Sequence, residues 1–226
     1  ELDSPNSPTR RVGAPPVDSF PSRAHARRMY SLDNCFSRED WDAWVTRLRK
    51  GLTGQEPALW ADPKLDGLAV ELVYERGELA AAITRGDGET GEVVTENLRT
   101  VASVPLTLKA GQGEIPEFLD VRGEVVMARE DFSRLNQRRA ENGEKEFANP
   151  RNAAAGSVRQ LDSSVTASRR LWFYAYGLGR GEELWPTHGQ AMEALDTFGF
   201  TTPPGAKACT EPGQVWELYE ELLGGR

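Results

Sequence analysis

The clearest pattern in the chain is an alternation of hydrophobic and polar side chains over residues 68–75. A period of two residues is typical of a β-strand with one buried face. The shared face would carry Leu68, Val70, Leu72 and Tyr74. Residues 75–77, Glu-Arg-Gly, then provide a turn, and Leu79–Thr84 returns as a second hydrophobic segment. The sequence therefore predicts a β-hairpin.

Helical periodicity dominates most of the remaining chain. Ser37, three residues before Asp40, predicts the N-cap of an amphipathic helix. Its apolar face would carry Trp41, Trp44, Val45 and Leu48. Further helices are predicted at residues 91–101, 129–141, 188–198 and 212–223. Another helix would begin at residue 149 and carry Arg151 and Arg159. Further strands are predicted at residues 119–127 and 171–176. Because the strands come as hairpins between unrelated helices, we predict an α+β fold with antiparallel sheets.

Length and charge narrow the class of protein. A chain of 226 residues fits one large domain, or one domain with an appendage. The 27 lysines and arginines against 35 aspartates and glutamates give a net charge of −8. This excludes a uniformly basic coat, so any polyanion must be met by a local cluster of Arg and Lys. No apolar run approaches the roughly 18 residues of a membrane helix, and the first residues resemble no signal peptide. We expect a soluble chain.

The cysteines and histidines exclude some chemistries. Cys35 and Cys209 are too few and too far apart for a disulfide framework or a zinc site. His25 and His188 cannot form a metal cluster and are interpreted as structural residues. Any catalysis is therefore expected from Lys, Arg, Asp, Glu or backbone groups.

Residues 86–91, Gly-Asp-Gly-Glu-Thr-Gly, match the G-x-G-x-x-G pattern of dinucleotide-binding folds. The strand before them is the return arm of a hairpin, not the first strand of a parallel βαβ unit. Asp87 and Glu89 would also put negative charge where a pyrophosphate should bind. We therefore favour a tight glycine-rich turn, and keep a Rossmann-type oxidoreductase only as a minor alternative.

Residues 64–67, Lys-Leu-Asp-Gly, form a K-x-D-G motif directly before the hairpin. A lysine amine can attack phosphorus or a carbonyl once desolvation or neighbouring cations lower its pKa. Asp66 could orient a metal ion or an attacking hydroxyl, and Gly67 could let the backbone approach a nucleotide closely. Alone, the motif is equally consistent with a surface turn.

Six motifs in a fixed order give this lysine a context. They are MYSLDN at 29–34, KLDGLAV at 64–70, TRGDGETGE at 84–92, VRGEVVM at 121–127, FANPRNAAAGSVRQLD at 147–162 and FYAYGLG at 173–179. Together they closely resemble the adenylation (nucleotidyltransferase) domain of bacterial NAD-dependent DNA ligases. The resemblance covers nearly the whole chain.

The resemblance implies a nucleotide site. Lys64 would be the nucleophile that takes AMP from NAD as a phosphoramide and releases nicotinamide mononucleotide. Asp66 would place a metal ion or the attacking DNA hydroxyl. Ser31 and Leu32 would line the adenosine pocket, and Tyr176 would stack on adenine.

The same resemblance assigns the remaining charged residues. Glu124 would bind ribose or organise a Mg²⁺ site, and Asp62 would reach the adenine edge. Arg85, Arg151 and Arg159 would contact phosphates of the adenylate or of the nick. Planar guanidinium groups suit phosphate oxygens, and nucleotidyl transfer depends mainly on positioning and charge neutralisation.

The chain departs from the family pattern in three places. Asp62 stands where the family usually has Glu, followed by Pro63, and Arg28 stands where Pro is usual. The family's distal lysine motifs would lie beyond the last residue. We expect residues 1–22 to be a linker remnant of an absent N-terminal subdomain, and residues 23–226 to be an adenylation domain without its C-terminal motifs.

The resemblance thus implies the adenylation core of an NAD-dependent DNA ligase, weak or inactive as a fragment. Its expected partners are NAD, Mg²⁺ and nicked double-stranded DNA, and we expect a monomer in the bacterial cytoplasm. A non-catalytic nucleotide- or nick-binding module stays open as the main alternative.

Overall fold

A computed structural model describes residues 11, 14–53, 55–110 and 114–224. Most of the predicted N-terminal linker lies outside the described residues. The chain divides into two compact units. The first comprises residues 1–29 and 64–203, and the second comprises residues 30–63 and 204–226.

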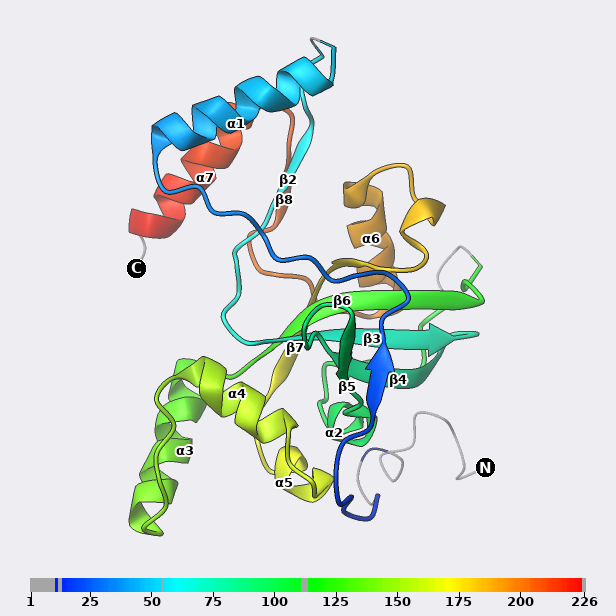
Figure 1. The fold of residues 1–226 in the computed structure, drawn as a ribbon, viewed down its shortest axis with the longest axis vertical. Coiled ribbons are helices and arrows are strands. Elements are labelled where there is room, and N and C mark those ends of the chain that lie inside the picture. The colour runs from blue at the N-terminus through cyan, green and yellow to red at the C-terminus, as the bar shows by residue number, and fades with distance from the viewer. Residues whose placement is uncertain (1–10, 12–13, 54, 111–113, 225–226) are drawn as a thin grey trace. The chain divides into compact units, whose positions relative to one another are not determined.

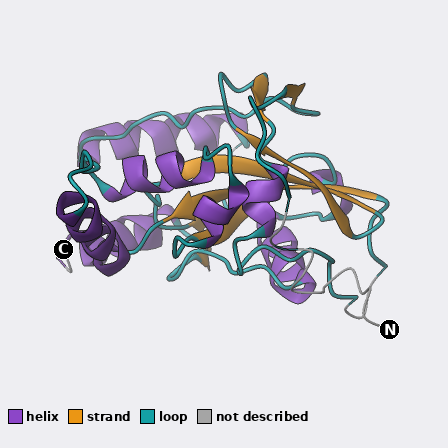
Figure 2. Cartoon of the chain, turned by 90° about the horizontal axis from the view of Figure 1, so that it is seen from below, coloured by secondary structure: helices purple, strands orange, loops and turns teal. Residues whose placement is uncertain are grey.

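The first unit is built on a four-stranded antiparallel sheet with the strand order β4-β3-β6-β7. The strands are β3 (Leu68–Glu75), β4 (Glu78–Thr84), β6 (Phe118–Val126) and β7 (Trp172–Leu178). Figure 1 shows them as long arrows, and Figure 2 presents them nearly edge-on, with the twist usual for such sheets. The predicted antiparallel α+β architecture is confirmed for the described part of the chain.

The predicted hairpin is present as β3 and β4. Glu75 pairs with Glu78, so Arg76 and Gly77 form a two-residue loop. Both have positive φ angles, 47° at Arg76 and 81° at Gly77. A type I′ turn requires positive φ at both central positions, and its twist matches that of the flanking strands.

The two faces of the sheet differ in chemistry. Val70, Leu72 and Tyr74 are fully buried on the face that forms the core. The opposite face carries charged residues, because Glu71 pairs with Arg122 and Ala69 pairs with Glu124 across β3 and β6. Residues directly opposite in an antiparallel pair project to the same side. This second face positions the candidate site.

Helices and short strands complete the first unit. Helix α2 packs against β4, α4 against β6 and β3, and α6 against β7. The helices are α2 (Thr95–Arg99), α3 (Arg129–Glu141), α4 (Pro150–Val158), α5 (Ser163–Ala167) and α6 (His188–Phe198), with a 3₁₀ turn at Glu182–Leu184. A two-stranded sheet joins β1 (Ser22–Ala24) to β5 (Thr90–Glu92).

The second unit contains two helices and a short antiparallel sheet. They are α1 (Arg38–Gly51), α7 (Pro212–Gly224), β2 (Leu59–Ala61) and β8 (Lys207–Cys209). The side chain of Ser37 accepts a hydrogen bond from the Asp40 amide, as the capping motif predicts. Trp41 of α1 stacks on Trp44 and contacts Trp216 of α7.

Three predictions about local structure need correction. The helix expected at 91–101 is only five residues long, because residues 90–92 pair with β1 instead. The short strands β1, β2, β5 and β8 were not predicted. Arg159 lies at the C-cap of α4 and not within the helix.

None of the described helices is long and apolar enough to cross a membrane.

Candidate active site

The K-x-D-G segment leads directly into β3. Lys64 and Asp66 are exposed, whereas Gly67 is buried against β6. A Cβ atom on Gly67 would lie 2.1 Å from the carbonyl oxygen of Val125. The absence of a side chain at Gly67 thus lets the motif cross close to β6, and its approach to a nucleotide stays a prediction.

Glu124 on β6 is the residue around which the predicted site assembles. Its Oε1 accepts a hydrogen bond from the Gly67 amide at 3.1 Å. Burial raises the pKa of Glu124, while Lys64, the Gly67 hydrogen bond, Arg151 and Arg85 act in the opposite direction. Three predicted cationic residues therefore lie within electrostatic reach of one carboxylate. The grouping of these residues in a nucleotide site stays a prediction.

The two arginines at the ends of α4 have carboxylate partners. Arg151 Nη1 lies 3.1 Å from Asp66 Oδ1, and both side chains are more than half exposed. Arg159 makes a bidentate pair with Glu92, with both nitrogen–oxygen distances at 2.7 Å. Exposed pairs of this kind contribute about 0–1 kcal/mol, so a phosphate could displace either carboxylate at low cost.

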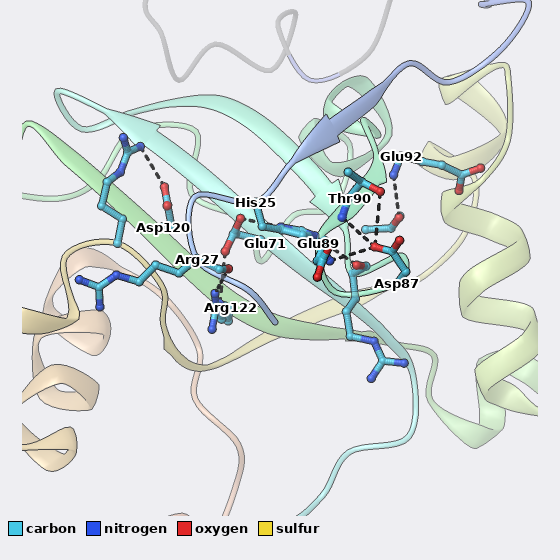
Figure 3. Close-up of polar contacts among 12 residues, drawn as sticks. His25, Arg27, Glu71, Asp87, Glu89, Thr90, Glu92, Asp120 and Arg122 are labelled. Atoms are coloured by element: carbon cyan, nitrogen blue, oxygen red, sulfur yellow. Dashed lines mark hydrogen bonds and ion pairs between the residues drawn. The ribbon is translucent and has the colours of Figure 1, made fainter. Parts of the chain in front are cut away.

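The glycine-rich loop after β4 is stabilised by one of its own carboxylates. Asp87 Oδ1 accepts hydrogen bonds from the amides of Glu89 at 2.9 Å and Thr90 at 2.8 Å (Figure 3). These bonds lower the pKa of Asp87. A carboxylate thus occupies the amides that a pyrophosphate would need, and the preceding strand belongs to an antiparallel sheet. This supports the interpretation of the loop as a tight turn.

A buried polar network lies beside this loop on the same face of the sheet. Glu71 is fully buried, with Oε2 at 2.7 Å from His25 Nδ1 and Oε1 at 3.2 Å from Arg122 Nε (Figure 3). The other ring nitrogen of His25 lies 3.1 Å from the carbonyl oxygen of Arg85, and Arg122 also donates to the Arg27 carbonyl. This network was not predicted from the sequence.

Hydrogen-bond chemistry fixes the proton content of this network. The Arg85 carbonyl can only accept, so His25 Nε2 must carry a proton. The short contact between His25 Nδ1 and Glu71 then requires a second proton, shared between the two groups. His25 thus ties the carboxylate of Glu71 to the backbone of Arg85.

Tyr176 lies on β7 at an irregularity in its pairing with β6. Arg122 pairs with Gly177 and Gly123 pairs with Ala175, so Tyr176 is the extra residue of a β-bulge. Such bulges redirect side chains and occur often beside active sites. Tyr174 pairs directly with Glu124, which places Tyr176 close to that residue along the strand. Stacking of Tyr176 on adenine stays a prediction.

Ser31, Leu32 and Asp62 belong to the second unit, where all three are exposed. Leu32 retains 75% of its accessible surface, which is unusual for a leucine. Their assignment to an adenosine pocket also stays a prediction.

No group of three or more potential metal-ligating residues occurs among the described residues. The two carboxylates assigned to a metal, Asp66 and Glu124, instead contact Arg151 and the Gly67 amide. Mg²⁺ commonly binds through one or two protein carboxylates plus substrate phosphates and waters. These residues therefore fit an ion that arrives with a phosphate-bearing substrate, but not an all-protein site.

The profile of the NAD-dependent DNA ligase adenylation domain family matches residues 17–226. The chain belongs to this family. A DNA ligase of Nitratidesulfovibrio vulgaris (strain DSM 19637 / Miyazaki F) is 51% identical over 98% of this chain and 29% of the relative. DNA ligases of Lawsonia intracellularis and Methylococcus capsulatus are 46% and 49% identical, over 100% and 98% of this chain and 33% of each relative. The chain thus spans about a third of the length of these curated relatives.

Membership in the adenylation domain family confirms the resemblance inferred from the six ordered motifs. One departure from the family pattern has a structural partner here. Arg28, which stands where proline is usual, lies 2.9 Å from Glu89 of the glycine-rich loop. Both side chains are more than half exposed, so this contact adds little stability.

Proposed function

We propose that this chain is the adenylation core of an NAD-dependent DNA ligase with a nucleotidyltransferase fold. The observation that carries this proposal is that Lys64, Arg85 and Arg151 all act electrostatically on the half-buried carboxylate of Glu124. Such a group of cations can offset the charge of a bound phosphate.

In the proposed step, Nζ of Lys64 attacks the phosphorus of the adenylate half of NAD. A phosphorus–nitrogen bond forms while the bond from that phosphorus to the bridging oxygen breaks. Nicotinamide mononucleotide leaves with the electron pair, and the nitrogen releases its proton to solvent. Arg85 and Arg151 neutralise the phosphate oxygens, and Glu124 orients ribose. Tyr176, Ser31, Leu32 and Asp62 contact adenosine.

The later steps belong to the proposal for the whole ligase. AMP passes from Lys64 to the 5′-phosphate of a nick, and the 3′-hydroxyl then attacks to seal the strand. Asp66 places that hydroxyl, and Arg151 and Arg159 contact phosphates of the nick. Glu124 or Asp66, together with substrate phosphates, would hold a Mg²⁺ ion, which would supply additional neutralising charge. We expect a monomer in the bacterial cytoplasm.

Retention of label on denatured protein tests the proposal. The chain, inserted in a related ligase that supplies the flanking segments, is incubated with NAD labelled in its adenylate half, denatured and washed. A covalent lysyl-AMP keeps the label, whereas a non-catalytic nucleotide-binding module or an oxidoreductase loses it. Lys64→Ala should abolish retention, and Lys50→Ala, on the exposed side of α1, should leave it unchanged. Label on the Lys64→Ala protein would contradict the assignment.

A further inference from the structure

A cavity of about 450 Å³ lies between α3 and the segment that follows α5. Arg134 and Arg138 line it from the helix, and Arg169 and Arg170 line it from the segment that leads into β7. We call these four residues the arginine pocket. The volume is within the range of small-ligand sites.

The periodicity of α3 explains how the helix supplies one wall of this cavity. Asp131, Arg134 and Arg138 are separated by three and four residues, and all three line the pocket. Residues at such spacings share one face of an α-helix. Leu135 lies beside them and is buried, so the helix is fixed in rotation and its charged face is turned toward Arg169.

The positive charge of the pocket is only partly compensated. Asp131 is shared between Arg134 at 3.6 Å and Arg170 at 3.9 Å, and Arg134 also lies 3.5 Å from Glu130. Glu141 accepts a hydrogen bond from Gln137. Among the residues that the structure describes, Arg138 and Arg169 have no ion-pair partner, and Arg138 bonds only to the Arg134 carbonyl. Burial, Arg138 and Arg139 all lower the pKa of Arg169.

This arrangement contrasts with the arginines at the ends of α4. Arg151 and Arg159 are the phosphate contacts predicted from the sequence, but each already has a carboxylate partner. An anion must displace Asp66 or Glu92 to reach them. In a chain with a net charge of −8, arginines that lack an ion-pair partner at a concave site favour an anionic ligand.

We propose that the arginine pocket binds a phosphodiester group of the DNA backbone, away from the nick. Four arginines line the cavity, and the planar guanidinium group binds phosphate oxygens in a bidentate manner. Met127, which lines the pocket, directly follows the last residue of β6 and lies three residues after Glu124. Their backbones are therefore roughly 10 Å apart. This corresponds to about three nucleotide rises of a DNA strand.

The proposal rests on the proposed function, which supplies DNA as the partner. Binding of a fluorescent nicked duplex to this chain is measured at a series of salt concentrations. Each neutralised phosphate contributes about 0.9 to the slope of log K against log salt. Arg138→Ala/Arg169→Ala should lower the slope by about one. Arg47→Ala/Arg49→Ala on α1 makes the same charge change elsewhere and should leave the slope unchanged.

A second readout follows the side-chain Nε–H resonances of Arg138 and Arg169 by NMR. The nicked duplex should shift both resonances, and inorganic phosphate should shift them only at much higher concentration. Equal slopes for the Arg138/Arg169 and Arg47/Arg49 variants would overturn the proposal. Shifts with polyglutamate but not with DNA would overturn it in favour of an acidic segment.

The outcomes separate this inference from the proposed function. If Arg151→Ala/Arg159→Ala lowers the slope and Arg138→Ala/Arg169→Ala does not, DNA binding stands and the arginine pocket is excluded as a DNA site. Label transfer from NAD to Lys64 is measured without DNA. Its failure would therefore contradict the proposed function independently of the pocket.

Discussion

The buried network around Glu71 predicts that His25→Ala will strongly destabilise the first unit. The side chains of His25 and Glu71 are both fully buried, and His25 is one of two side chains that contact the carboxylate, the other being Arg122. Removing one partner of a buried ion pair costs about 3–5 kcal/mol, because the remaining charge stays out of water. The lost bond to the Arg85 carbonyl adds about 1 kcal/mol. Arg122 still contacts Glu71, so we expect a total near 4 kcal/mol.

The assay must report on the first unit alone. Four of the six tryptophans, Trp41, Trp44, Trp60 and Trp216, lie in the second unit, so intrinsic fluorescence would mainly follow that unit. Hydrogen exchange of peptides from β3 and β6, followed by mass spectrometry in urea, gives the free energy of opening of the sheet. His188→Ala is the matched control, because His188 is exposed and such changes usually stay within about 0.5 kcal/mol.

A second variant tests the electrostatic reason. In His25→Ala/Glu71→Gln the uncompensated charge is gone, and Arg122, whose side chain is 16% exposed, can reach water. This double variant should recover about 1–2 kcal/mol relative to His25→Ala. Equal stability of the single and double variants, or a cost for His25→Ala no larger than for His188→Ala, would refute the reasoning.

Three further predictions follow from the site. Gly67→Ala should cost about 3 kcal/mol, because its Cβ would lie 2.1 Å from the Val125 carbonyl, whereas Gly213→Ala meets nothing within 4 Å and should be neutral in urea unfolding. Burial raises the pKa of Glu124 in the folded protein above the ordinary glutamate value of 4.5. Ionisation of Glu124 therefore lowers the stability of the folded state as the pH rises above 4.5. Glu124→Gln should therefore stabilise the first unit at pH 7, with the gain vanishing below pH 4.5, while adenylation is lost; an unchanged pH profile would contradict this. Asp87→Ala should accelerate amide exchange in the glycine-rich loop, and protection that persists would show that the carboxylate does not hold it.

Much of the fold follows from local sequence signals. Residues 129–141 were predicted as a helix and form α3 with the same bounds, because the polar pattern is periodic and uninterrupted. The β3–β4 hairpin was predicted from alternation and from Glu75-Arg76-Gly77, whose backbone preferences select the turn. The three-residue strands were missed, since each exists only through its pairing with a distant segment.

The candidate site was predicted less completely, for a related reason. The family motifs identified Lys64 and Glu124, but not the partners that surround the charged groups. Glu71 contacts His25, 46 residues away, and Arg151 contacts Asp66, 85 residues away. Such pairs depend on tertiary packing, which no local pattern encodes. A glutamate inside a hydrophobic alternation, as at Glu71, was the one available signal that a buried partner exists.

The central claim is that Lys64 becomes covalently adenylated, and locating the adenylate on the chain tests it most directly. Residues 1–226 are placed in the 51% identical ligase of Nitratidesulfovibrio vulgaris in exchange for its matching segment, so that flanking segments are supplied. After incubation with NAD, tandem mass spectrometry of the digested protein identifies the modified residue. We predict one AMP, linked through nitrogen to Lys64, and none in the Lys64→Ala protein. Adenylate on another residue, or no adenylate in a folded chimaera whose parent ligase is labelled, would contradict the account.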